Sequence, residues 1–123
     1  MINNSRGVSL YLTLMTMSIL IALALGISVI LFSQLKMTRT IGYSIMAFYA
    51  SDTGIERTLY EISQGAKIED CVGKEDCYKE TLENGSSYIA TIIGPGPTCS
   101  AANYCIKSIG IYKDTKRAIR LSR

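Results

Sequence analysis

The sequence predicts an α+β fold in which one long N-terminal helix carries a small antiparallel β-sheet on its outer half. Three observations support this prediction. No charged residue occurs from Val8 to Leu35, and no proline follows that run until Pro95. Apolar residues recur at helical spacing as far as Ile62. Beyond Gly65 the pattern changes to β-branched runs separated by turn residues.

Four segments follow from these patterns. They are a short N-terminal segment (residues 1–7), the transmembrane part of the helix (8–35), its outer amphipathic part (36–64) and a small β domain (65–123) that contains all four cysteines. A domain of this size buries only a thin core and often needs a cross-link or a partner to be stable.

The first long segment is apolar enough to cross a membrane, since about 20 apolar residues span a bilayer as a helix. Its most apolar part is LMTMSILIALALGISVILF. A cleaved secretory signal is the alternative, with Ala22-Leu23-Ala24 as its cleavage site. The apolar run continues from Ile27 to Phe32 beyond that site, which favours a helix that is retained.

The outer part of the helix is expected to place one apolar stripe against the sheet. The stripe consists of Ile41, Ile45, Phe48, Ile55, Leu59 and Ile62. Asp52 interrupts it, and this carboxylate either pairs with Arg57 or a basic residue of a strand, or is turned to solvent. Gly65 is the expected C-cap residue of the helix.

Three strands are expected in the C-terminal domain, at Ser87–Ile93, Tyr104–Lys113 and Lys116–Ser122. Turns are predicted at Asn84-Gly85 and at Asp114-Thr115. The last two strands each present two apolar residues on one face, and we expect these to cover the end of the helix stripe. They are Ile109 and Ile111, then Ile119 and Leu121, lying over Ile55, Leu59 and Ile62.

The four cysteines, an even number behind a membrane segment, favour disulfides in an oxidising compartment. Structural zinc is disfavoured, because five residues separate the cysteines of each pair, whereas zinc sites favour two to four. Local pairing, Cys71–Cys77 and Cys99–Cys105, is preferred because short loops close at little entropic cost. Nested pairing, Cys71–Cys105 with Cys77–Cys99, stays open because the equal spacing suits antiparallel segments.

Charge is unevenly distributed, although the net charge is only +3. Residues 52–83 contain nine acidic and four basic residues, and residues 84–123 contain one acidic and six basic residues. The two blocks either attract each other, within one molecule or between neighbours, or are solvated faces without a partner. The basic C-terminal block includes Lys113, Lys116, Arg117, Arg120 and Arg123. Successive strand residues point to opposite faces, so DNA binding by this block is disfavoured.

The composition gives no support for catalysis. The chain has no histidine, which removes the commonest general base and the commonest metal ligand. No phosphate-binding loop, nucleophile motif or metal-ligand spacing occurs. We therefore expect a protein that is not an enzyme and that has no cofactor and no metal.

The sequence around Gly7 points to a family. Ser5-Arg6-Gly7 before Val8-Ser9-Leu10, the charge-free run and the long helix leading into strands together resemble the type IV pilin and pseudopilin superfamily. The stretch AFYASDTGIER, residues 47–57, resembles the minor pilins of the PilX type, and residues 106–110 with 117–119 resemble a hairpin common in such proteins. The resemblance implies that residues 1–7 are a prepilin leader, that a prepilin peptidase cleaves between Gly7 and Val8, and that Val8 is then N-methylated.

The same resemblance implies partners and a location. The partners are other pilin subunits through the N-terminal helix, the prepilin peptidase, an inner-membrane assembly platform and the lipid bilayer. The chain would cross the cytoplasmic membrane once, with its C-terminal domain outside, and then enter a surface or periplasmic filament. Lys36 and Arg39 after the apolar run favour the opposite orientation, but the cysteines and the junction favour an outer C-terminal domain.

Leu12 departs from the family pattern. Most major pilins have a glutamate at this position, which pairs with the N-terminal ammonium of a neighbouring subunit, and a buried ammonium without a partner is costly. Leu12 therefore indicates a minor pilin or pseudopilin, in a priming or tip position, rather than a bulk subunit. Gly26 either marks a point where the helix loosens in filaments or allows close helix packing. The alternative function is a single-pass membrane protein, outside any filament, whose outer domain binds a ligand or regulates a partner.

Overall fold

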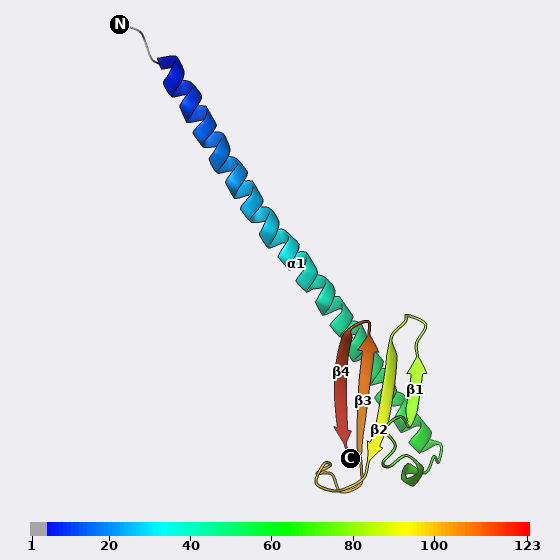
Figure 1. Cartoon of the computed structure of the whole chain (residues 1–123). Helices are drawn as coiled ribbons and strands as arrows, with labels where there is room; N and C mark the ends of the chain where they lie inside the picture. Colours follow the sequence, from blue (N-terminus) through cyan, green and yellow to red (C-terminus); the bar gives the residue numbers. More distant parts are fainter. Residues whose placement is uncertain (1–4) are drawn as a thin grey trace. The chain divides into compact units, whose positions relative to one another are not determined.

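The computed structural model describes residues 5–123 and has one long helix followed by a four-stranded sheet (Figure 1). The elements are α1 (Ser5–Ser63), the short 3-10 helix η1 (Ile68–Asp70), β1 (Tyr78–Thr81), β2 (Ser87–Ile93), β3 (Cys105–Tyr112) and β4 (Thr115–Ser122). The strands form one antiparallel sheet in the order β1-β2-β3-β4. The predicted α+β fold is thus confirmed. Met1 to Asn4, part of the predicted leader, lie outside the described residues.

The chain forms two compact units, which meet in the sequence at Thr38 and Arg39. In the first unit, every residue from 7 to 38 is helical and exposed. Its hydroxyl groups bond to the helix itself; Thr13 Oγ1, for example, donates to the Leu10 carbonyl oxygen at 2.8 Å. By length and composition, with a mean hydropathy of 2.5 in its most apolar stretch, this helix can cross a membrane.

The second unit packs the last part of α1 against one face of the sheet (Figure 1). A Cβ atom on Gly110 of β3 would collide with the carbonyl oxygen of Ala47, and one on Gly54 would collide with the Tyr88 ring. The helix and β3 therefore approach closely because glycine occupies the point of contact on each side. Most of the buried helix residues along this seam are correspondingly small, namely Ala47, Ala50, Ser51, Gly54 and Thr58.

Larger side chains fill the space between the sheet and the end of α1. The buried cluster consists of Ile55, Cys71, Ile92, Tyr104 and Ile106. Leu59, Ile62, Ile119 and Leu121 are partly buried against it, as the sequence predicts. α1 ends at Ser63, and Gly65, which has a φ of 94°, caps it. The Gly65 N–H donates to the Ile62 carbonyl and the Ala66 N–H to the Glu61 carbonyl, a Schellman cap.

The structure corrects two predictions about the packing. The first half of the predicted stripe is wrong, because Ile41, Ile45 and Phe48 are exposed. The prediction for Ile109 and Ile111 is also wrong, because both lie on the sheet face away from the helix. In β3 the residues turned to the helix are Ile106, Ser108 and Gly110. Gly110 must face the helix, because a larger residue would collide with the helix backbone. Since successive strand residues point to opposite faces, Ile109 and Ile111 then face away from the helix.

The turns and one strand also differ in detail from the prediction. The three strands expected from the sequence do not include β1, a four-residue edge strand with three exposed residues and no apolar alternation. The last hairpin turns at Lys113 and Asp114, since Tyr112 pairs with Thr115. Lys113 takes a φ of 50° there. The turn at Asn84-Gly85 is confirmed, with a φ of 80° at the glycine.

Candidate processing junction, disulfide loops and charged surfaces

The predicted processing junction lies near the start of α1. Gly7 has no atom within 4 Å of a Cβ built on it, and the Val8 side chain is 65% exposed. Leu12, one helical turn further, is exposed as well. Gly26 also has open space around it. Among residues 7–123, whose side chains the structure describes, none packs around these positions.

The cysteines form the two local disulfides, Cys71–Cys77 and Cys99–Cys105. The pairing preferred from the sequence is thus the one in the structure, and the nested arrangement is absent. Since all four sulfur atoms are bonded in pairs, none of these cysteines is a free thiolate that could bind zinc. The first bridge closes the loop that follows η1, and the second closes the loop that leads into β3.

The disulfide loops border the sheet at the end where α1 stops. Val72, inside the first loop, forms an isolated bridge to Ile92 of β2. Thr91 Oγ1 donates to the Glu75 carbonyl at 2.9 Å. The first loop therefore continues alongside β2 beyond the end of β1, and the Cys71–Cys77 disulfide holds this otherwise irregular segment against the sheet. A surface hollow of about 450 Å³ lies beside it, between residues 72–75 and residues 91–98.

One polar contact on the helix side of the sheet involves a buried tyrosine. The Tyr88 phenol donates a hydrogen bond to Glu80 Oε2 at 2.9 Å, linking β2 to β1. Burial, followed by the hydrogen bond and the negative charge of Glu80, raises the pKa of Tyr88 to about 12. Next to this ring, Ser108 Oγ is buried, and the described residues provide it with no hydrogen-bond partner.

The acidic and basic blocks of the sequence do not pair with each other in the described part of the chain. The ion pair found there, Arg57 to Glu61 at 3.0 Å, joins neighbouring turns of α1 inside the acidic block. Asp52 is exposed, and it makes no ion pair with Arg57 or with a strand residue. Of the alternatives for Asp52, the structure has the one in which it is turned to solvent.

The basic residues of the last two strands divide between the two faces of the sheet. Arg117 lies on the helix side, where its Nε donates to Ser44 Oγ. Lys116 and Arg120 lie on the outer side, and Arg120 donates to the Thr98 carbonyl at 3.2 Å. Lys113, in the turn, donates to the Tyr43 hydroxyl at 3.1 Å. The basic residues are thus divided between the two faces of the sheet and do not form one patch, as the alternation of strand residues predicts.

Comparison with protein-family models, with curated protein sequences and with solved structures gives no match for this chain. The Lys113–Tyr43 contact is one feature that the sequence does not reveal, because seventy residues separate the partners. Only the packing of the last hairpin against α1 brings them together.

Proposed function

We propose that this chain is a structural subunit of an extracellular or periplasmic filament, a minor pilin of the PilX type or a pseudopilin. In this function a prepilin peptidase removes residues 1–7, and the helix from Val8 onward is first held in the membrane and then packed among other subunits. The C-terminal domain stays outside the membrane throughout.

The observation that carries the proposal is a long apolar helix behind an Arg-Gly junction, followed directly by a small folded unit with two disulfides. Residues 7–38 bury nothing in the described part of the chain. An apolar surface of this kind needs lipid or other apolar helices to cover it. A subunit that moves from a bilayer into a helical bundle presents the same surface to both surroundings.

Leu12 supports a priming or tip position within this class. A subunit that has another subunit ahead of it must accept that neighbour's N-terminal ammonium in an apolar bundle, and a leucine cannot neutralise the charge. No charged residue lies between Val8 and Leu35 to replace the missing acid. A subunit at the tip of the filament has no such ammonium to accept.

The test is the mass of the mature chain. The full chain is expressed in membranes together with a prepilin peptidase, and its intact mass is measured. The expected species begins at Val8 and carries one added methyl group. Gly7→Leu should leave only the chain that begins at Met1, because a bulky residue replaces the glycine before the scissile bond.

Gly26→Leu is the matched control. It makes the same substitution in the same helix, at a second glycine with open space around it, and it should still be processed. A native chain that keeps Met1 in the presence of active peptidase contradicts the proposal. That result favours the alternative of a single-pass membrane protein outside any filament.

A further inference from the structure

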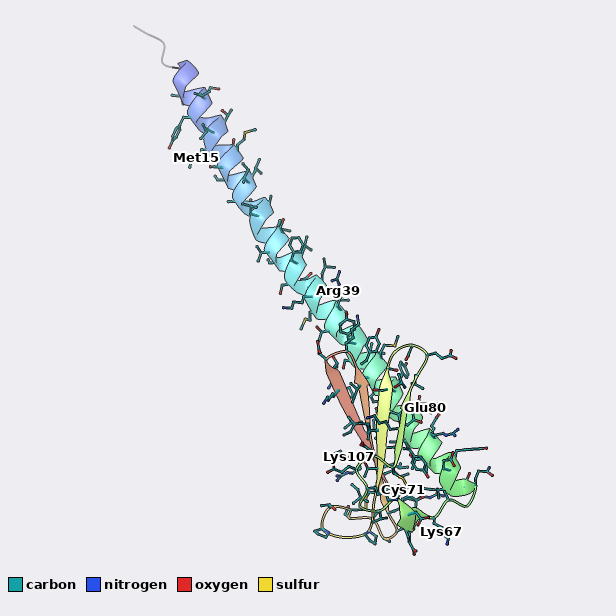
Figure 2. The ribbon with its side chains drawn as sticks, turned by 45° about the vertical axis from the view of Figure 1, so that its right-hand side comes forward. Met15, Arg39, Lys67, Cys71, Glu80 and Lys107 are labelled. Atoms are coloured by element: carbon teal, nitrogen blue, oxygen red, sulfur yellow. A yellow bond between two sulfur atoms is a disulfide. The ribbon has the colours of Figure 1, made fainter. Side chains whose placement is uncertain are left out.

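The turn between β1 and β2 contains an acceptor motif for N-glycosylation that the proposed function leaves unused. Asn84-Gly85-Ser86 has an asparagine, then a residue other than proline, then a serine, which is the pattern that an N-linked glycan requires. Figure 2 shows Glu80 of β1 on the side of this turn, at the end of the sheet opposite to Cys71. The same pattern also occurs at Asn3-Asn4-Ser5, in the predicted leader.

The Asn84 side chain has the position that glycan attachment requires. Asn84 is exposed, as are Glu83 and Gly85 on either side of it. Its Oδ1 accepts two hydrogen bonds from Ser86, one from the backbone N–H at 3.0 Å and one from the hydroxyl group at 2.6 Å. Nδ2, the atom that a glycan joins, donates no hydrogen bond within the described residues. A reaction at Nδ2 therefore breaks no contact of the fold.

The two hydrogen bonds from Ser86 also favour reaction at the amide nitrogen. When an amide nitrogen gives up a proton, negative charge builds up on the amide oxygen, and donors aimed at that oxygen stabilise it. The turn that supplies these donors involves residues 84–86 alone, so it can form before the sheet does. In the folded unit Ser86 is fully buried. The whole motif is therefore accessible to an enzyme only before β1 and β2 pair.

The folded turn has room for a bulky group on Asn84. Main-chain bonds hold the turn, from the Leu82 N–H to the Ser86 carbonyl at 2.7 Å and from the Gly85 N–H to the Leu82 carbonyl at 3.0 Å. Gly85 supplies the φ of 80°, and no described atom lies within 4 Å of a Cβ built on it. None of these contacts uses the Asn84 side-chain nitrogen, so a glycan on it leaves the hairpin unchanged.

We propose that Asn84 is the acceptor of an N-linked glycan. The donor is an oligosaccharide whose first sugar is joined through its C1 atom to a lipid diphosphate. A bond forms between Asn84 Nδ2 and C1, while the bond from C1 to the diphosphate oxygen breaks and the lipid diphosphate leaves with the electron pair. The proton of Nδ2 passes to a carboxylate of the transferase, and no oxidant or reductant takes part.

This inference rests on the outer position of the C-terminal domain in the proposed function. The two disulfides of that domain favour the same side of the membrane, because they are typical of the oxidising compartments in which N-linked glycans occur. A glycan is bulky and hydrophilic, and it keeps the surface around it in water. The β1–β2 turn then faces solvent in the filament, and contacts with other subunits are left to the rest of the second unit.

The test is the mass of one tryptic peptide of the native chain, purified from membranes of the organism that makes it. Cleavage after Lys79 and Lys107 yields residues 80–107. This peptide should carry the added mass of sugars, and an amidase that removes N-linked glycans should leave an aspartate at the attachment site. Asn84→Gln and Ser86→Ala should each abolish the added mass, whereas Ser86→Thr should retain it.

Asn103→Gln is the matched control. It removes a second exposed asparagine of the same peptide, one that no serine or threonine follows at the required spacing, and the glycan should remain. Formation of both disulfides, measured in the same digest, shows that each variant is folded. A native peptide without sugar overturns the inference, as does a glycan that persists in the Asn84→Gln chain.

A grafted motif separates failure of this inference from failure of the proposed function. Lys113→Asn, made in the Asn84→Gln chain, completes the same pattern with Asp114 and Thr115 in the β3–β4 turn. Lys113 is exposed and has a φ of 50°, which asparagine tolerates. If the graft carries sugar while the native peptide does not, the outer domain reaches the transferase, so the inference is wrong and the proposed function stands. Sugar on Asn3 with none on Asn84 contradicts the outer position, and hence both.

Discussion

The two halves of α1 differ in the size of the side chains that they present and in what those side chains contact. From residue 7 to residue 38 the helix exposes large apolar side chains on all sides. Between Ala47 and Thr58 its buried face consists mainly of alanine, serine, glycine and threonine. The difference shows that apolar character alone does not locate the packed face of a helix, because closeness of approach selects for small residues.

The exposed apolar surface continues past Arg39 on the side of the helix that the sheet does not cover. Ile41, Ile45 and Phe48 are each about half exposed, and Tyr49 is 62% exposed. Ile45, Phe48 and Tyr49 line a second surface hollow of about 580 Å³ next to Arg117. Under the proposed function, this side of the second unit is available to the helix of another subunit.

The largest expected effect comes from breaking the close seam in the second unit. Gly110→Ala places a Cβ against the backbone of Ala47 and Ser51, where neither side can move without separating the helix from β3. We expect a loss of about 3 kcal/mol in the unfolding free energy of this unit. Chemical denaturation of the full chain in micelles, followed by far-ultraviolet circular dichroism, measures the change.

Gly42→Ala is the control for that substitution. Gly42 lies in α1, the helix that Gly110 contacts, and has open space around it, so alanine should leave the second unit unchanged or stabilise it slightly through helix propensity. If Gly110→Ala is as well tolerated as Gly42→Ala, the seam is not closely packed and the contrast between the two halves of α1 fails.

The sequence predicts the elements of this fold better than their contacts. The long helix and the cap at Gly65 follow from composition, spacing and short-range chemistry, and short-range chemistry also favours the local disulfides over the nested pairing. The sequence does not show which residues of β3 face the helix, because Ile109 and Ile111 are as apolar as Ile106. The contact of Gly110 with Ala47 decides this, and it joins residues far apart in the sequence. For the candidate site, the junction at Gly7 stays a prediction from the sequence, whereas the Lys113–Tyr43 contact is known only from the structure.

A second prediction compares two apolar residues of α1 that the sequence places on one stripe. Leu59 packs against the core cluster, whereas Ile41 is 54% exposed. Leu59→Ala should cost about 2 kcal/mol, the low end for a large-to-small change, because Leu59 is only partly buried. Ile41→Ala should stay within about 0.5 kcal/mol. Thermal unfolding of the second unit measures both, and equal melting temperatures would show that the two residues share one environment.

The smallest expected effect tests a polar contact of the second unit, the hydrogen bond from Tyr88 to Glu80. Burial and Glu80 raise the pKa of Tyr88 from 10.0 to about 12, so the folded state holds this proton more tightly than the unfolded state does. The resulting stability is fully present below pH 10 and is lost as the pH rises from 10 toward 12. Tyr88→Phe should remove this pH dependence and cost about 1 kcal/mol below pH 10 through the lost hydrogen bond. Tyr60→Phe, at a residue that is 54% exposed, should keep the dependence of the unchanged chain. Denaturation midpoints across this pH range decide the matter, and a Tyr88→Phe chain that loses stability as steeply as its parent would assign the pH dependence to other groups.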